Sequence, residues 1–201
     1  MDLFPGMVNP AQRHEEALRF LATRRSRPPK MLGLPAPGRE SILEFLSIAS
    51  RVPDHGKLEP WRFVVLEKPA LERLADEAAV FAAKHNLPED VAAKGVAQFV
   101  QSPLVIAVIA VPRPTDRVPE IEQTLSVGAA AMQLLNAALA AGWGACWLTG
   151  WVAHDIRFAT PAYDLQPGEW VAGLVHIGAE AATPPERPRP LLGEVTTWVS
   201  T

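Results

Sequence analysis

Three adjacent polar residues follow the first helical segment of the sequence. Arg24 and Arg25 carry planar guanidinium groups, and Ser26 carries a hydroxyl. Guanidinium forks, hydroxyls and loop amides are the donors that a phosphate monoester prefers. Arg187 and Arg189, late in the sequence, could add to the same site. The pattern indicates an anion-binding site, and the alternative that the same spacing allows is a basic helix end with solvated arginines.

A second group of candidate donors lies in the stretch SRVPDHGKLEPWRF, residues 50 to 63. Two prolines, a histidine and four charged side chains crowd the residues before Trp61, more chemistry than a connecting turn requires. Arg51 and His55 are the candidate ligand-binding residues here. The alternative for His55 is an ordinary turn residue.

Other common catalytic and binding motifs are missing from the sequence. GWGACW, residues 142 to 147, resembles half of a dinucleotide fingerprint, but it follows a helical segment and has Trp147 where the third glycine belongs. The single Cys146 excludes an internal disulfide and is expected to be a buried thiol. No histidine pair has metal-ligand spacing, so no metal site is expected.

Alternating helical and strand patterns must position these residues. Apolar spacing predicts helices over 11–23, 40–50, 69–86, 88–101 and 124–141, and strands over 61–67, 104–111, 144–151 and 169–179. The helix over 124–141 is apolar nearly all round, so it must be enclosed, either by the sheet or by a second subunit. The pattern predicts an α+β fold with a central mixed or antiparallel sheet flanked by helices.

The ends of the sequence are expected to project from one domain spanning residues 1–201. Residues 1–12 read as an N-terminal extension, and residues 183–201 as a C-terminal arm. TPPERPRP (183–190) is expected to be extended because consecutive prolines block helix and sheet ladders. EVTTWVS (194–200) could add a short strand to the edge of another sheet.

The composition describes an ordinary globular protein. The chain has 201 residues, 48% apolar and 20% charged, with a net charge of -3. This balance offers no general basic field for nucleic acid. No apolar run is long enough to span a bilayer, and the first residues lack the pattern of a secretion signal. We therefore expect a cytoplasmic protein.

Four motifs together resemble the nitroreductase family of flavin enzymes, and look most like its small, minimal NAD(P)H-dependent branch. They are RRS, RVPDHGKLEPWRF, VPEIEQTLSVGAAAMQLLNAALAAGWGACWLTG and LVHIGAEAATPPERPRP, in that order. The match extends from about Arg13 to Thr197.

The resemblance implies an α+β homodimer that binds two FMN molecules at the subunit interface. Arg24, Arg25 and Ser26 would hold the FMN phosphate and ring edge. Arg51 and His55 would reach into the site of the partner subunit. The remaining positions implied are Trp147, Leu148 and Thr149 along the flavin, and Arg187 or Arg189 at the phosphate.

The resemblance also implies a ping-pong oxidoreductase. NAD(P)H would deliver a hydride to flavin N5 and leave, and a nitroaromatic, a quinone or a similar small acceptor would then be reduced in the same pocket. No side chain is assigned as catalytic acid or base, because the cofactor carries the electrons. The alternatives are a flavin protein of this fold with another reaction, such as dehalogenation or flavin fragmentation, and a non-enzymatic FMN-binding protein.

One departure concerns the edge of the pocket. Larger relatives favour an amide-rich N-x-Q-P-W before the strand, whereas this chain has Lys57 and Glu59 in KLEPW. The contact that those amides make is therefore not expected here.

Overall fold

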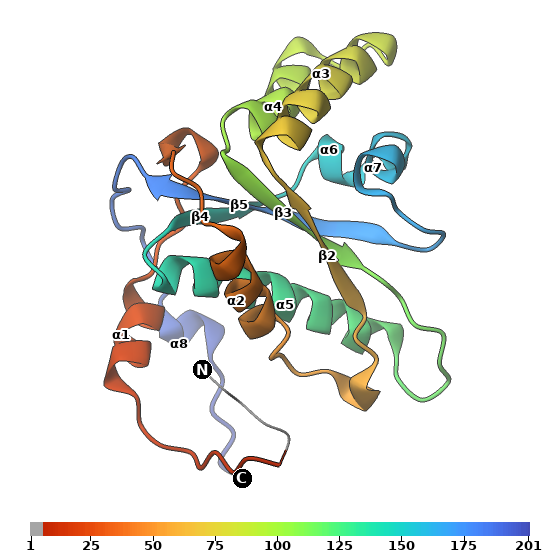
Figure 1. Cartoon of the computed structure of the whole chain (residues 1–201). Helices are drawn as coiled ribbons and strands as arrows, with labels where there is room; N and C mark the ends of the chain where they lie inside the picture. The colour runs from red at the N-terminus through yellow and green to blue at the C-terminus, as the bar shows by residue number, and fades with distance from the viewer. Residues whose placement is uncertain (1–5) are drawn as a thin grey trace.

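A computed structural model describes residues 6–201, so the first five residues of the predicted N-terminal extension 1–12 lie outside the described residues. Helices and antiparallel strands share this part of the chain (Figure 1). The strands are β1 (Leu32–Gly33), β2 (Trp61–Leu66), β3 (Leu104–Ala110), β4 (Gly144–Leu148) and β5 (Trp170–Glu180). The α-helices are α1 (Glu15–Thr23), α2 (Arg39–Ala49), α3 (Lys68–Lys84), α4 (Glu89–Val100), α5 (Glu120–Ala140), α6 (Trp151–His154), α7 (Ile156–Tyr163) and α8 (Leu192–Val195), with short 3-10 turns η1 (Pro29–Met31) and η2 (His55–Lys57).

The sheet is antiparallel at every pairing between the described strands. β5 lies between β3 and β4, and β2 pairs with the other edge of β3. The short β1 pairs with the end of β5. β3 is buried along its whole length, as its continuous apolar run predicts.

Helices cover both faces of the sheet and create two cores (Figure 1). One core packs α2 and α5 against the strands around Phe45, Ile106 and Leu134. The other packs α3, α4, α6 and α7 around Leu74, Phe99 and Phe158. The predicted α+β architecture with a central antiparallel sheet is confirmed.

Two helices differ from the predicted ones at their first turns. α5 begins at Glu120, four residues before the predicted start, because its first turn is acidic rather than apolar. Acidic side chains there interact favourably with the helix dipole, although an apolar pattern does not reveal them. α1 begins at Glu15 rather than at residue 11, and again two glutamates occupy its first turn.

One predicted strand is shorter than expected, and another is not formed within the single chain. β4 ends at Leu148 rather than at residue 151, because Gly150 (φ 136°) breaks the strand and Trp151 starts α6. Residues 194–200 form no strand within the described chain, where α8 and irregular backbone occupy this segment. A strand requires a pairing partner, and no strand of the same chain lies against this segment.

Among the described residues, no helix is long and apolar enough to cross a membrane.

Candidate functional site

The arginines that follow α1 line a cleft with a volume of ≈ 530 Å³. Three segments build it: the loop after α1, the strand β4, and the proline-rich segment before α8. The predicted site residues that share this cleft are Arg24, Arg25, Ser26, Trp147, Leu148, Arg187 and Arg189. The structure therefore brings together seven of the ten predicted positions.

Backbone and side-chain hydrogen bonds hold the three segments together. The backbone N–H of Arg27 donates to the carbonyl of Ala145 at 2.8 Å, which ties the loop to β4. Arg25 Nε donates to the carbonyl of Pro185 at 3.1 Å, which ties the loop to the proline-rich segment. Arg27 also pairs with Glu180 at the end of β5, at 2.7 Å. The cleft is thus assembled from positions far apart in the sequence.

The cleft concentrates positive charge around Arg24. Burial lowers the pKa of Arg24, and the neighbouring charges of Arg189, Arg25 and Arg27 lower it further. Its Nε is buried without a hydrogen-bond partner, although its Nη2 donates to Ser26 Oγ at 3.1 Å. A half-buried guanidinium with an unpartnered buried Nε and several like charges nearby favours an anion as its partner.

The carboxylate of Glu186 lies beside two of these arginines. Its Oε1 lies 2.8 Å from Arg189 Nη2 and 3.9 Å from Arg25 Nε. A hydrogen bond from the backbone N–H of Arg187 lowers the pKa of Glu186, and the positive charges of Arg189 and Arg25 lower this pKa further. The sequence alone does not mark Glu186 as a site residue, because its place beside Arg25 depends on the path of the proline-rich segment.

Trp147 forms part of the cleft wall from β4. Its Nε1 donates to the carbonyl of Ala172 on β5 at 3.3 Å. A Cβ built on Gly173 would lie 1.7 Å from this Nε1, so the indole fits against β5 because residue 173 has no side chain. Gly173 is a residue that the sequence analysis missed, since only the pairing of β4 with β5 places it under the tryptophan.

Two other predictions concern the neighbours of Trp147. Thr149 is exposed and does not line the cleft, and its carbonyl accepts a hydrogen bond from Gln98 Nε2 at 2.9 Å. Cys146 lines the cleft but is buried, as expected. Burial raises the pKa of the Cys146 thiol to about 12, so the thiolate needed for nucleophilic chemistry does not form near neutral pH.

Arg51 and His55 lie elsewhere in the chain. Arg51 is exposed at the end of α2, and its side chain forms no ion pair with the described residues. His55 Nδ1 lies 2.7 Å from Glu122 Oε2, in the first turn of α5. In Figure 1 the turn that follows α2 lies at the opposite end of α5 from α1 and α8. Within one chain, these two residues therefore do not complete the arginine cleft.

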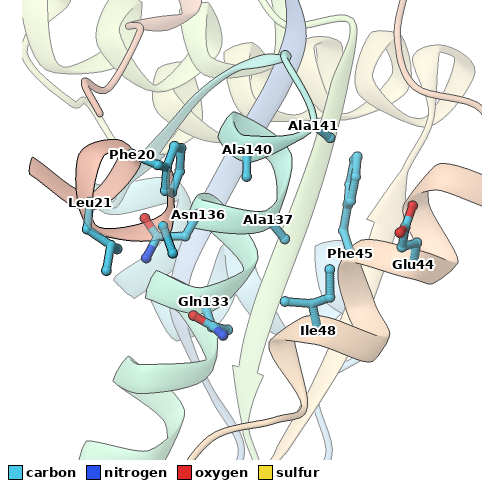
Figure 2. Close-up of a pocket in the computed structure, with 11 residues that line it drawn as sticks. Phe20, Leu21, Glu44, Phe45, Ile48, Gln133, Asn136, Ala137, Ala140 and Ala141 are labelled. Atoms are coloured by element: carbon cyan, nitrogen blue, oxygen red, sulfur yellow. The ribbon is translucent and has the colours of Figure 1, made fainter. Parts of the chain in front are cut away.

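An apolar groove of ≈ 450 Å³ lies between α1, α2 and α5. Figure 2 shows Phe20 from α1 and Phe45 and Ile48 from α2 facing the small side chains of α5. Its few polar groups include Asn136, whose Oδ1 is buried without a partner. This groove has neither the charge nor the donors of the arginine cleft, so it is not the candidate anion site.

No group of three or more histidine, cysteine, aspartate or glutamate residues in the described part of the chain is arranged to hold a metal ion. Donor types and charge in the arginine cleft fit a phosphate instead. The residues present therefore fit the phosphate of the cofactor that the sequence resemblance implies.

Comparison with known proteins identifies the relatives of this chain. The sequence model of the Nitroreductase family matches residues 23–179. A Haemophilus influenzae protein named "Putative NAD(P)H nitroreductase" is 38% identical over 165 residues, which cover 81% of this chain and 88% of the relative. The Escherichia coli K12 protein "Putative NAD(P)H nitroreductase YdjA" is 31% identical over 166 residues, covering 81% and 87%.

Solved structures share the fold. A nitroreductase-like family protein from Bacillus cereus superposes with a TM-score of 0.77 at 20% identity, over 94% of this chain and 99% of that one. A Desulfovibrio desulfuricans protein described as "a putative nitroreductase in complex with fmn" gives a TM-score of 0.70 at 21% identity, over 94% and 99%.

Proposed function

The chain belongs to the nitroreductase family, and we propose that it is an FMN-dependent NAD(P)H oxidoreductase that reduces a nitroaromatic, a quinone or a similar small acceptor. The observation that carries the proposal is the buried, unpartnered Nε of Arg24 within a cluster of arginines. This donor set suits a phosphate monoester. The names of two relatives and the FMN bound by a protein of the same fold support the choice of cofactor and electron donor.

The cleft residues divide into two roles in this proposal. Arg24, Arg25 and Ser26 would hold the phosphate, together with Arg187 or Arg189 across the cleft. Trp147 and Leu148 would line the flavin, and the contact of Trp147 with β5 fixes the indole. Thr149 is given no direct contact in this proposal, because it does not line the cleft. When bound, FMN supplies hydride acceptance and donation at its N5.

A homodimer with two shared sites is part of the proposal. Arg51 and His55 would complete the flavin site of the partner subunit, since they cannot reach the arginine cleft of their own chain. The outward face of α5 supports such an interface, because Ile121 is 60% exposed, Leu125 is 65% exposed, and open space surrounds Gly128. Trp198, near the end of the predicted arm 183–201, is 90% exposed. Large exposed apolar side chains of this kind mark interaction surfaces.

The chemistry that the chain itself must supply is binding and orientation. Cys146 is excluded as a nucleophile by burial, and no side chain of the cleft is assigned as acid or base. We propose one pocket used in turn by NAD(P)H and by the acceptor, in a ping-pong reaction. One domain spanning residues 1–201 would carry this function.

The experiment that tests the proposal is an absorption spectrum of the purified protein, followed by anaerobic addition of NADH or NADPH. Flavin absorption that bleaches with the nucleotide and returns with a nitroaromatic or quinone is the expected result. A protein that binds FMN but does not bleach would be a non-enzymatic flavin binder. A protein that neither carries nor takes up FMN would refute the proposal.

A further inference from the structure

Glu122 lies in the first turn of α5 and forms an ion pair with the turn at residues 53–59. Among the described residues, no other ion pair involves this turn. Glu122 Oε2 lies 2.7 Å from His55 Nδ1. Both side chains remain partly exposed, and an exposed pair of this kind contributes little to folding stability. The pair therefore has a different consequence from a structural salt bridge: it determines which nitrogen of the imidazole is available to a ligand.

The turn itself is held in an uncommon conformation. Lys57 (φ 55°) and Glu59 (φ 48°) both have positive φ angles, although neither is a glycine. Backbone conformations of this kind persist only where surrounding contacts impose them, and they concentrate at functional sites. The carboxylate of Asp54 imposes this one locally, because it accepts hydrogen bonds from the backbone N–H groups of Leu58 and Glu59 at 3.1 and 2.9 Å.

The start of α5 supplies the remaining contacts. Ser126 Oγ donates to the carbonyl of Pro53. Gln123 Oε1 accepts from the backbone N–H of Arg113 at 2.8 Å, and Arg113 Nε in turn donates to the carbonyl of Leu58 at 3.2 Å. Two of these contacts hold the backbone of the turn. The contact of Glu122 is of another kind, because it holds only the His55 side chain.

We infer that Glu122 is a positioning residue for the flavin site: by accepting a hydrogen bond at His55 Nδ1, it directs His55 Nε2 outward toward the flavin of the partner subunit. This inference rests on the proposed function, in which His55 contacts that flavin. A histidine ring whose Nδ1–H is donated to a carboxylate has one nitrogen left for a ligand and a fixed ring orientation. Glu122 would thus act on FMN only through His55.

A double-mutant cycle tests this dependence. FMN affinity is measured by fluorescence titration for Glu122→Ala, His55→Ala and the double variant. We expect Glu122→Ala to weaken FMN binding about three- to tenfold, as the loss of one oriented hydrogen bond would. In the His55→Ala background the same change should have less than about a twofold further effect. Full additivity would overturn the inference.

Glu120→Ala is the matched control, because it removes a carboxylate from the same helical turn. It should leave FMN affinity within about twofold of the unchanged protein. An equal loss in both variants would mean that the general charge of α5, rather than the contact with His55, is responsible, and would overturn the inference. A clear fall in the melting temperature of the Glu122→Ala protein would overturn it as well, because that is the signature of a structural role.

The ring of His55 can also be observed without a flavin. Nitrogen NMR of the imidazole should report Nδ1 as the hydrogen-bonded nitrogen, and Glu122→Ala should change that signal while Glu120→Ala does not. An unchanged signal would refute the positioning role even if the protein proved not to bind FMN. FMN binding that is normal in the unchanged protein and insensitive to Glu122→Ala would refute this inference alone and leave the proposed function intact.

Discussion

Replacing Arg24 with alanine should weaken binding of the cofactor and leave the stability of the apoprotein nearly unchanged. In the proposed holoprotein the change removes a charge-assisted hydrogen bond to phosphate, which is worth about 1.5–3 kcal/mol. FMN binding should therefore weaken roughly 10- to 150-fold. In the apoprotein the change removes the 3.1 Å bond to Ser26, but it also removes a half-buried charge beside Arg25, Arg27 and Arg189.

These two effects on the apoprotein have opposite signs. The lost hydrogen bond costs about 0.5–1.5 kcal/mol, and the relief of burial and like-charge repulsion offsets it. For a chain of this length the melting temperature should then change by less than about 4 °C in either direction. A residue kept for folding would behave differently, because its loss would lower the melting temperature whether or not FMN is present.

The assay combines fluorescence titration of FMN into apoprotein with thermal unfolding of the apoprotein. Arg19→Ala is the control, since it removes the same charge from the exposed surface of α1. Two results would refute the reasoning: an FMN dissociation constant within about threefold of the unchanged protein, or a fall in apoprotein melting temperature well beyond about 4 °C.

Three further predictions concern single positions. Gly128→Ala should stabilise α5 by about 0.5–1 kcal/mol because nothing lies within 4 Å of the added Cβ, whereas Gly128→Trp should give a folded monomer in sedimentation; a dimer with Trp at this position would contradict the proposed α5 interface. Burial lowers the pKa of His176 to about 3, so between about pH 3 and pH 6.5 the unfolded chain binds one proton more than the folded chain. As the pH is lowered through this window, the free energy of unfolding decreases by up to about 1.4 kcal/mol per pH unit. His176→Gln should make urea unfolding less sensitive to pH across this window, and an unchanged pH slope would show that His176 is not buried and neutral. Finally, the pKa of about 12 for Cys146 predicts no reaction with a thiol reagent at mildly alkaline pH until the protein is unfolded, and rapid labelling of the native protein would contradict this burial.

The sequence predicted the elements whose side chains repeat with a clear period. The run over 104–111 became the central strand β3, and the apolar helix over 124–141 lies within α5. The polar first turn of α5 was missed because it contributes charge complementarity instead of apolar period, and the helix predicted over 11–23 began four residues before α1. The strand predicted over 144–151 ended early at Gly150, whose positive φ no composition rule specifies.

The hydrogen-bond donors of the site were predictable from the sequence, but the contacts that bring its three segments together were not. Arg24, Arg25 and Ser26 are adjacent in sequence, so their shared chemistry is visible without a structure. The position of Glu186 beside Arg189 and Arg25 depends on the path of the proline-rich segment. The fit of Trp147 over Gly173 depends on the register between β4 and β5, in which Trp147 stands opposite Val175. Such contacts follow from tertiary packing, which local sequence does not encode.

The hydrogen bond between Arg25 and Pro185 joins residues that are 160 positions apart. The pairing of β1 with β5, which sets Leu32 opposite Glu180, already brings these two ends of the chain together. A ligand held by both Arg24 and Arg189 would therefore act as a non-covalent cross-link between the loop after α1 and the proline-rich segment that follows β5. Ordering the few residues between Glu180 and Arg189 costs chain entropy, and the ligand would supply the compensating free energy only after the sheet has formed. The cleft would thus be completed at the end of folding, and its occupancy would protect the proline-rich segment from proteases.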